Sequence, residues 1–598
     1  MRRKPGYLPR ILLTAGAVLL IAGCSLFPWQ SSRYGGDTSE VFFLNVGRDS
    51  AREISYTLRL GSDIADVYFA FVNYGVSSTN VPLVVSSSVV PPQGSGEEDG
   101  TGSVVVPRAG RSVGASGTIL DRRVEPNVIS AFNGNPPEMI PGPAGNSSRS
   151  AAGSRSLVPR ADLEGDTITF YQYNGDFSTP VQTPATLRRV VSDGNGMTVN
   201  VWVEDALFGP NGTPDLVTPE KVDALANTFL APGEHNDIYD WVSTVIGAPW
   251  GPHGFINLLP PDRADTIDIL LVDILRDGAT DSGVVGYFWG KDNYLRTANG
   301  QATDESNERI MFYLDALMYG QEEGGWDSGN SWPQLVFSTL AHEFQHMIHF
   351  YQKTVLRTGS GDSAVWLNEM LSLVTEDLVA FEMDVPGPRG VDPVAVPDGG
   401  PGSSGNVDGW LGLFNDNNDI GLYSWDTADP IPNYAISYGF GSFLVRNYGG
   451  AAFLRETVQN QFVGQDAVEE ALDVVRARVS YREVLSEWAA AVLTSDEEID
   501  PSKWGTLDSV YNTGGWFESS LDGAIYRLGS INLYNHETGE SPMPGPRFYS
   551  GATIGSESVR PGGSVVYYRA GESLTGTHEW TFNIGANTDV VVVAKQAP

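Results

Sequence analysis

Hydrophobic and polar positions follow different patterns along the chain, which divide it into β-rich ends and a mixed centre. Near the N-terminus, apolar residues alternate with polar ones or run together in strand-length pieces broken by Gly, Asn and Ser. These pieces are EVFFLNVG, SYTLRL and DVYFAFVNYG, within residues 40–75. The C-terminal part repeats the pattern in SVVYYRAG, EWTFNIG and DVVVVAK, within residues 564–595. We therefore expect a small β-sandwich at each end.

The centre combines strand and helix patterns. Three apolar runs, MTVNVWVED, IDILLVDIL and ERIMFYLDAL, are typical of buried strands. They are residues 197–205, 267–275 and 308–317. TPEKVDALANTFLA, residues 218–231, predicts a helix, because Thr218 can cap it and Pro219 fits its first turn. Helical periodicity returns from Tyr438 to about Ser495.

Segments rich in Gly, Pro and Ser mark the expected boundaries. PPQGSGEEDGTG begins at Pro91, and NPPEMIPGPAGNSSRSAAGSRS begins at Asn135. This composition is typical of flexible loops and linkers. The pattern predicts a multidomain α+β protein with a sandwich-like domain, a linker, a central domain and a C-terminal β-rich domain. Their expected ranges are 39–134, 135–161, 162–505 and 506–598.

The first residues have the pattern of an export signal. MRRKPGYLPR is basic, and the apolar run ILLTAGAVLLIAGC after it is too short to span a membrane as a helix. Ile21-Ala22-Gly23-Cys24 resembles the lipobox of bacterial lipoproteins, in which the cysteine takes a diacylglycerol after cleavage. We therefore expect residues 1–23 to be removed, Cys24 to carry a lipid, and residues 24–38 to form a tether. The resemblance implies an exported lipoprotein held at the cell envelope, on its periplasmic or cell-surface side.

Charge and cysteine content narrow the classes further. The chain carries 73 acidic and 37 basic residues, for a net charge of −36. Such a surface repels nucleic acid and favours solubility, so no nucleic-acid partner is expected. Cys24 is the one cysteine, which excludes an internal disulfide.

Three of the seven histidines fall within AHEFQHMIHF, residues 341–350. His342 and His346 are four positions apart, so on a helix they lie one turn apart and can bind one metal ion. Glu343 lies beside His342 and can reach a water on that ion. This is the H-E-x-x-H pattern of zinc sites, with two ligands and a general base. With so few histidines, a chance match is expected on the order of once in a few hundred such chains.

A following predicted helix offers further candidates. SAVWLNEMLSLVTEDLVAF has a core stripe that includes Leu367 and Leu371, and Glu369 projects from another face. Glu376, two turns later on that face, either bonds a ligand imidazole or is a plain surface acid. His349 lies about 10 Å along the helix axis from His342, so a satisfied or solvent-facing histidine is favoured over a further ligand.

The order AHEFQHMIHF, then WLNEMLS, resembles the gluzincin metallopeptidases, and in particular the hyicolysin family of secreted bacterial neutral metallopeptidases. The resemblance implies a zincin, thermolysin-like α/β catalytic domain with a helical C-terminal lobe. It implies that the second helix returns antiparallel beneath the first and that Glu369 is the third zinc ligand. The residue after this glutamate is often glycine in gluzincins, whereas here it is Met370, which could narrow the substrate pocket.

A tyrosine downstream is a candidate for transition-state stabilisation. Related gluzincins of the aminopeptidase group carry a Tyr-x-x-Gly segment whose tyrosine bonds the oxygen of the tetrahedral intermediate. Tyr438 and Gly441 match that spacing, and the role of Tyr438 would be to donate to developing negative charge. Tyr434 competes for this role, and an ordinary core tyrosine is the third interpretation.

Together these features predict zinc-assisted hydrolysis of protein or peptide substrates. Glu343 would take a proton from a zinc-activated water and pass it to the leaving amine. An endopeptidase is the default, because no Lys/Arg cluster marks a reader of substrate termini. Residues 308–317 would be the edge strand on which an extended substrate docks.

Three alternatives accompany this prediction. The first is a surface lipoprotein that binds partners and carries an inactive peptidase domain. The second is a purely structural zinc site, which normally closes the fourth position with another Cys or His. The third concerns FNDNNDIGLYSWD, residues 414–426, which offers oxygen ligands for Ca²⁺. It lacks the regular spacing of a known calcium loop, so a solvated loop is favoured there.

Overall fold

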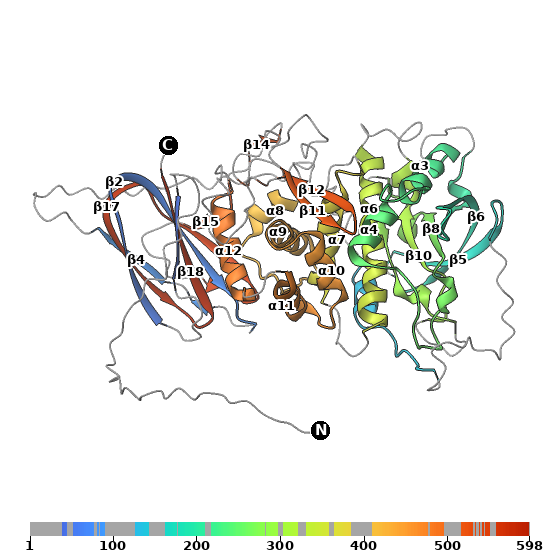
Figure 1. Cartoon of the computed structure of the whole chain (residues 1–598), viewed down its shortest axis with the longest axis horizontal. Helices are drawn as coiled ribbons and strands as arrows, with labels where there is room; N and C mark the ends of the chain where they lie inside the picture. Colours follow the sequence, from blue (N-terminus) through green and yellow to red (C-terminus); the bar gives the residue numbers. More distant parts are fainter. Residues whose placement is uncertain are drawn as a thin grey trace, which may run out of the picture.

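The structure is a computed structural model of the chain. It describes residues 39–44, 52–76, 81–82, 84–89, 126–142, 162–175, 177–209, 217–280, 283–296, 303–320, 331–357, 364–383, 410–475, 479–495, 516–529, 531, 533, 537–538, 541–542, 545–549 and 558–596. In these residues a β-sheet at one end, a group of helices in the middle and an α/β unit at the other end follow one another along the longest axis (Figure 1). Cys24, the predicted signal and tether, the segment that begins at Pro91 and residues 143–161 of the predicted linker lie outside the described residues. Among the described helices, none is both long enough and apolar enough to span a membrane.

A mixed six-stranded sheet forms the base of the α/β unit, in the order β5-β6-β7-β8-β10-β9. Its strands are β5 Thr167–Tyr173, β6 Pro180–Ser192, β7 Thr198–Glu204, β8 Thr266–Val272, β9 Gly286–Tyr287 and β10 Met311–Asp315. Strands β7, β8 and β10 are parallel, and the short β9 is antiparallel to β10. The expectation that residues 308–317 form the edge strand is therefore wrong. These residues supply β10, which lies inside the sheet because β9 pairs with its outer side.

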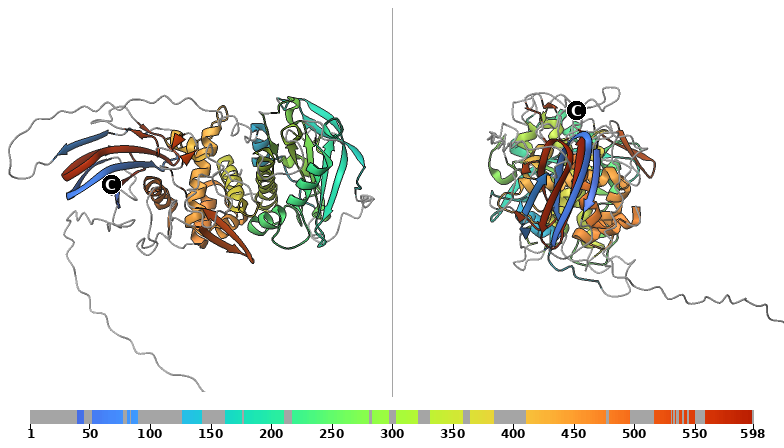
Figure 2. Two further views of the ribbon diagram at one scale, coloured as in Figure 1. Left: turned by 90° about the horizontal axis from the view of Figure 1, so that it is seen from above. Right: turned by 90° about the vertical axis from the view of Figure 1, so that its left-hand side faces the viewer.

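Helices cover this sheet and continue into the middle of the molecule. They are α3 Pro219–Phe229, α4 Ile238–Ile246, α5 Ala316–Gly320, α6 Ser331–His349, α7 Val365–Val379, α8 Trp410–Asn417, α9 Ile431–Asn447, α10 Ala451–Gln459, α11 Gly464–Val475 and α12 Tyr481–Leu493. Thr218 caps α3 as predicted, because its side chain accepts from the Lys221 N–H. Helix α6 lies between the sheet and helices α7–α12 (Figures 1 and 2).

An apolar stripe along α6 and the turn after it is buried. Its members are Val336, Leu340, Phe344, Met347, Ile348 and Tyr351. Beyond His349 the helix widens into a π-turn, Phe350–Val355, where the Lys353 ammonium donates to the carbonyls of Thr457 and Asn460. Short 3₁₀ turns complete the α/β unit at Asp205–Leu207, Pro261–Arg263, Ile274–Arg276 and Gly290–Asn293.

The two ends of the chain meet in one sheet, of order β1-β18-β2-β17-β15 with β4 on β17. Its strands are β1 Ser39–Leu44, β2 Arg52–Asn73, β4 Val84–Val89, β15 Phe548–Tyr549, β17 Ser564–Ile584 and β18 Thr588–Gln596. The expectation of separate N-terminal and C-terminal sandwiches is therefore corrected. Strand β2 pairs with both β17 and β18, so its long hydrogen-bonded edges and its buried Phe69 and Phe71 require the C-terminal strands.

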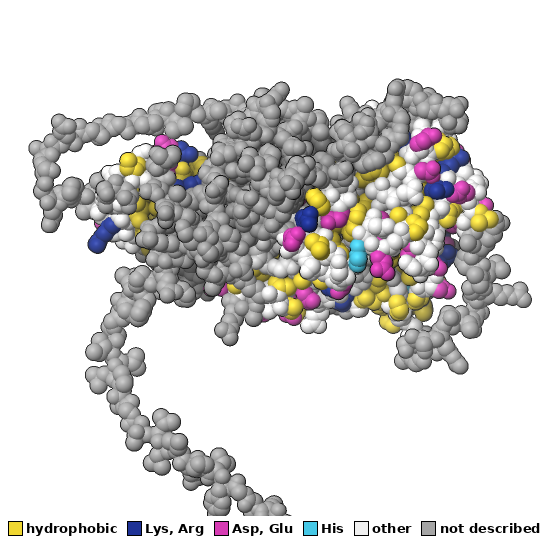
Figure 3. Space-filling model, turned by 45° about the horizontal axis from the view of Figure 1, so that its top comes forward, with side chains coloured by type: hydrophobic (Ala, Val, Ile, Leu, Met, Phe, Trp, Pro, Cys, Tyr) yellow, Lys and Arg dark blue, Asp and Glu magenta, His cyan; other side chains and the backbone are white. Residues whose placement is uncertain are grey.

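Smaller strands lie near the helical region and the terminal sheet. The hairpin β11–β12 is Trp516–Leu521 with Ala524–Gly529, and β13–β14 is Glu537–Thr538 with Ser541–Pro542. The last pair is β16 with β3, Ser558–Val559 with Val81–Pro82. In the view of Figure 3, acidic and basic side chains are scattered over the described surface of the α/β unit.

Helix α2, Asn127–Gly134, does not belong to the N-terminal β-region to which the sequence pattern assigned it. Ile129 is fully buried in a cluster with residues of the α/β sheet, and the Phe132 ring packs edge-on against Trp289 and Tyr294. Residues that follow α2 stay on the same unit, since Pro141 forms a bridge with Phe255. The boundary expected at residue 134 is thus displaced: α2 and the residues up to Gly142 are part of the central unit.

Candidate metal centre

Helices α6 and α7 run antiparallel and turn their polar residues toward each other. Ser338, near the start of α6, contacts Glu376 near the end of α7, whereas His346 contacts Glu369 near the start of α7. On α7, residues 369, 372 and 376 share one face because they are three and four positions apart. The antiparallel return implied by the sequence resemblance is present, and a buried polar seam runs between the two helices.

Three predicted ligands converge in this seam. The Nε2 atom of His342 lies 3.4 Å from Glu369 Oε2, and that of His346 lies 3.6 Å from the same oxygen. The three ligand atoms all lie within 4.8 Å of one another. Among the described residues, this is the one group of three or more His, Cys, Asp or Glu side chains with such convergence.

Each histidine has a neighbour that fixes its orientation. Glu376 Oε1 lies 2.8 Å from His342 Nδ1, and the Ser338 hydroxyl donates to the other oxygen of Glu376. Of the two interpretations left open for Glu376, the bond to a ligand imidazole is therefore the observed one. The Ser372 hydroxyl donates to Gln345 and lies 3.2 Å from Nδ1 and 3.3 Å from Nε2 of His346. With its Nδ1 engaged by Glu376, the His342 ring presents Nε2 to the centre of the group.

The ionisable groups of the site favour a bound cation. Burial by itself would lower the pKa of His342, but the neighbouring carboxylates of Glu369 and Glu376 outweigh burial and raise that pKa to about 10. Burial would raise the pKa of Glu369, yet the neighbouring His346 and His342 hold it at about 2. Three buried carboxylates thus face two imidazoles, and the excess negative charge is balanced either by protons or by a metal ion.

Orphaned atoms support the same interpretation. The Nε2 atom of His342 and one oxygen each of Glu343 and Glu369 are buried without a hydrogen-bond partner among the described residues. Buried polar atoms normally have partners. A divalent ion bound by two imidazole nitrogens and a carboxylate oxygen would satisfy the two ligand atoms, and two His with one Glu is a donor set of catalytic zinc sites. The residues therefore fit a zinc ion.

Glu343 is set apart from the ligands by its surroundings. It is 4% exposed, and burial raises its pKa to about 6, although the two histidines pull it down. A carboxyl with a pKa near neutrality can accept a proton and return it, as a general base must. The structure thus places Glu343 beside the ligand group, in surroundings that raise its pKa toward neutrality.

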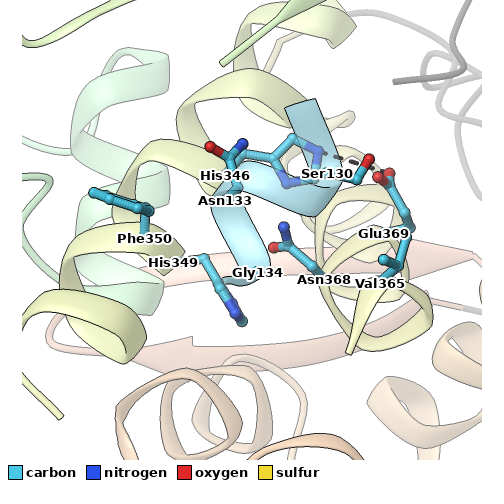
Figure 4. Close-up of a pocket in the computed structure, with 9 residues that line it drawn as sticks. All are labelled: Ser130, Asn133, Gly134, His346, His349, Phe350, Val365, Asn368 and Glu369. Atoms are coloured by element: carbon cyan, nitrogen blue, oxygen red, sulfur yellow. Dashed lines mark ion pairs between the residues drawn. The ribbon is translucent and has the colours of Figure 1, made fainter. Parts of the chain in front are cut away.

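A small pocket opens onto one side of the group. It is lined by His346, His349 and Glu369 on one side and by Ser130, Asn133 and Gly134 of α2 on the other. In Figure 4, α2 crosses this pocket close to His346 and Glu369. His349 lies on the pocket wall and outside the three-residue group, and burial lowers its pKa well below the usual value.

Tyr438 is not brought to the cluster by the contacts of its hydroxyl. The hydroxyl lies 3.4 Å from Asp377 Oδ2, an oxygen that also lies 2.8 Å from Arg446. Asp377 is about 12 Å along the α7 axis from Glu369, so this position favours the core tyrosine over the oxyanion donor. Tyr434, the competitor, stacks on Trp410.

Gly441 has a packing reason. A Cβ atom at this position would lie 2.6 Å from Met370 Cγ and 2.7 Å from Val374 Cγ1, so the glycine lets α9 approach α7 closely. Met370 therefore packs against α9, and the expectation that it narrows the substrate pocket is not supported. Both glycine and tyrosine of the Tyr-x-x-Gly match are accounted for by contacts between these helices.

The calcium expectation for residues 414–426 gains no support. Asn415 and Asn418 donate to the backbone carbonyls of Leu533 and Val565, and Asp419 accepts from the Tyr549 hydroxyl. These polar groups tie the segment to other parts of the chain. A calcium ion there stays a prediction.

Sequence reasoning missed several residues of the site. Ser338 and Ser372 were not singled out, although each lies at helical spacing from a ligand within an otherwise apolar helix, and that spacing was the available signal. Asn133 and the rest of α2 had no comparable signal, because nothing local connects them with residues more than 200 positions away.

A helix pair that joins H-E-x-x-H to a glutamate of the following helix defines a metallopeptidase-type centre. Comparison with known proteins places the chain more narrowly. Residues 180–498 match the Peptidase M30 family, and the chain belongs to that family. This match confirms the resemblance seen in AHEFQHMIHF and WLNEMLS.

A characterised relative is the neutral metalloprotease ShpI of Staphylococcus hyicus. It is 25% identical to this chain over 306 residues, which cover 50% of this chain and 57% of the relative. The chain thus spans less than two thirds of the length of this relative. The match supports the family assignment.

Proposed function

We propose that the protein is a zinc-dependent peptidase, and specifically an endopeptidase, that hydrolyses peptide bonds of protein or peptide substrates. The observation that carries this proposal is the convergence of His342, His346 and Glu369 within 4.8 Å, with Glu343 next to them. Membership in the Peptidase M30 family supports it. An endopeptidase is favoured over an exopeptidase because the sequence shows no Lys/Arg cluster that would read a substrate terminus.

The residues of the chain divide the work of hydrolysis. His342, His346 and Glu369 would hold zinc, which when bound supplies a Lewis acid that polarises the scissile carbonyl and lowers the pKa of a water. Glu343 takes the proton of the attacking water and hands it to the leaving amine. Glu376 and Ser372 hold the two imidazoles in place. Burial excludes bulk water from the group and strengthens each of these interactions.

We also propose that Cys24 carries the lipid that holds the protein at the cell envelope. The lipobox-like Ile21-Ala22-Gly23-Cys24 supports this, and among the described residues no helix suited to span a membrane offers a second anchor. Replacing the cysteine in Cys24→Ser should move the protein from the membrane fraction to the soluble fraction or leave its signal uncleaved. A membrane fraction unchanged by Cys24→Ser would overturn the anchor.

The function is tested by metal analysis together with hydrolysis. Purified protein should contain one zinc per chain and cleave casein, lose both after treatment with a zinc chelator, and regain cleavage on addition of zinc. The alternative, a binding lipoprotein with an inactive peptidase domain, predicts no cleavage at any zinc content. Zinc-loaded protein that cleaves neither casein nor a panel of peptides under any condition would refute the proposed activity.

A further inference from the structure

Helix α2 reaches the metal centre from a part of the chain far from α6 and α7. Ser130, Asn133 and Gly134 line the same pocket as His346 and Glu369 (Figure 4). His346 and Glu369 are each 1% exposed in this arrangement. Helix α2 forms one wall of the pocket that leads to these two residues.

The hydrogen bonds that hold α2 resemble those of an added strand. The Asn133 carboxamide donates to the Phe288 carbonyl at 2.8 Å and accepts from the Gly290 N–H at 2.8 Å. Phe288 directly follows β9, which lies at the edge of the sheet next to β10, and Gly290 begins the 3₁₀ turn Gly290–Asn293 just after it. A residue of an added parallel strand would bond the same pair, a carbonyl and an N–H two positions apart. A carboxamide has the donor and the acceptor of a peptide group, so Asn133 bonds this pair as the backbone of an added strand would.

Further contacts hold the segment in place. Asn257 accepts from the Ile140 N–H at 2.8 Å and donates to the Glu138 carbonyl at 2.9 Å. The Tyr294 hydroxyl donates to the Pro137 carbonyl at 2.8 Å. Residues 127–142 are thus tied to the α/β unit by side chains that bond to backbone groups, by backbone bonds of Ile140 and Gly142, and by the buried Ile129.

The helix itself has few features that would stabilise it without this support. It has eight residues, no side-chain cap at its N-terminus, and no acidic residue in its first turn. Isolated helices of this length are marginal in water. Its order therefore depends on docking, as expected of a segment that can leave.

We propose that α2 is a self-inhibitory segment that occupies the backbone-binding edge beside the metal centre and must undock before a peptide reaches Glu343. This inference rests on the proposed peptidase function. Removing the Asn133 bonds, which α2 makes to the α/β unit, favours the undocked form. Removing the Asn257 bonds, which the α/β unit makes to the residues after α2, favours it as well. The docked and undocked forms then differ in access to the site and share the same ligands.

The test compares Asn133→Ala and Asn257→Ala with the wild type in the full chain, all loaded with zinc. Two ordinary hydrogen bonds are worth roughly tenfold in an equilibrium, so each variant should show about tenfold higher kcat/KM on a long peptide. Zinc content should stay at one per chain. Asn307→Ala is the matched control, because Asn307 also bonds an N–H and a carbonyl of the backbone, both of Tyr171, away from α2. It should lower thermal stability without raising kcat/KM.

A second measurement removes dependence on the folding of any variant. Hydrogen exchange of residues 127–134 is followed in wild-type protein with and without a zinc-binding peptide hydroxamate. Faster exchange of α2 in the presence of the hydroxamate is expected, because the peptide displaces the helix. Slower exchange, or lower kcat/KM in both Asn133→Ala and Asn257→Ala, would show that α2 is a fixed wall and would overturn the proposal. If wild type and variants hold zinc and none cleaves any peptide, the peptidase function itself has failed.

Discussion

Removal of Glu376 should weaken zinc binding even though Glu376 is not a ligand. Its carboxylate lies 2.8 Å from His342 Nδ1, and both side chains are nearly fully buried, at 1% and 3% exposure. Without Glu376 the imidazole loses the partner that directs Nε2 to the metal, and Nδ1 is left buried and unpaired. A hydrogen bond to a charged group contributes about 1.5–3 kcal/mol. At about 1.4 kcal/mol per tenfold change in Kd, Glu376→Ala should raise the zinc Kd by about 10–100-fold, the range found for such partners.

The assay is competition for zinc with a chromophoric chelator of known affinity. Glu376→Gln should show a smaller increase in Kd, since its amide oxygen still accepts from Nδ1 without a full charge. Asp377→Asn is the matched control: the same change of carboxylate to amide at the adjacent buried position, where the partner is Arg446 at 2.8 Å. Asp377→Asn should lower the melting temperature and leave the zinc Kd within about twofold of the wild-type value. This expectation follows from the distance between Asp377 and the ligands. Wild-type zinc affinity in Glu376→Ala would refute the reasoning.

Three further predictions follow from the same contacts. Tyr438→Phe should keep kcat within about threefold of wild type, whereas loss of a true oxyanion donor costs about 10²–10³-fold, so a loss of that size in steady-state kinetics would restore the oxyanion role. Gly441→Ala should lower the free energy of unfolding by about 1–3 kcal/mol in urea titrations, because overpacking forces α7 and α9 apart, and an unchanged midpoint would contradict the close approach. The kcat/KM of the zinc enzyme should rise with pH along an acid limb centred at or below about pH 6. Glu343 must be ionised to act, burial raises its pKa to about 6, and a bound cation can only lower that pKa. A midpoint well above pH 7 would exclude Glu343 as the group whose ionisation controls kcat/KM.

The elements that the sequence predicts well are those with local signals. Helix α6 combines a continuous apolar stripe with His342 and His346 at one-turn spacing, and both features depend only on helical periodicity. Glu369 and Glu376 lie seven residues apart on α7 and share a face for the same reason. The short path between α6 and α7 makes an antiparallel pair the natural arrangement, so the ligand group follows from two helices and one turn of the chain.

The parts that the sequence does not predict depend on long-range pairing. Tyr68 of β2 lies opposite Arg569 of β17, about 500 residues later in the chain. No periodicity in the sequence indicates that the two β-rich ends pair with each other. The position of α2 is not predicted for the same reason. Asn133 bonds to Phe288 and Gly290, which lie far from it in the sequence, and no local pattern connects them. The role of Tyr438 stays a prediction, and the glycine of its Tyr-x-x-Gly match packs against Met370, a contact between helices that the local spacing does not indicate.

The most direct test of the central claim is peptide hydrolysis by Glu343→Gln with its metal content measured on the same sample. Glutamine keeps the shape of the side chain but cannot accept the proton, whereas His342, His346 and Glu369 remain to bind zinc. General-base catalysis contributes about 10²–10⁴-fold, so kcat should fall by at least about a hundredfold while zinc stays at one per chain. A Glu343→Gln protein with full zinc and undiminished cleavage would contradict the account.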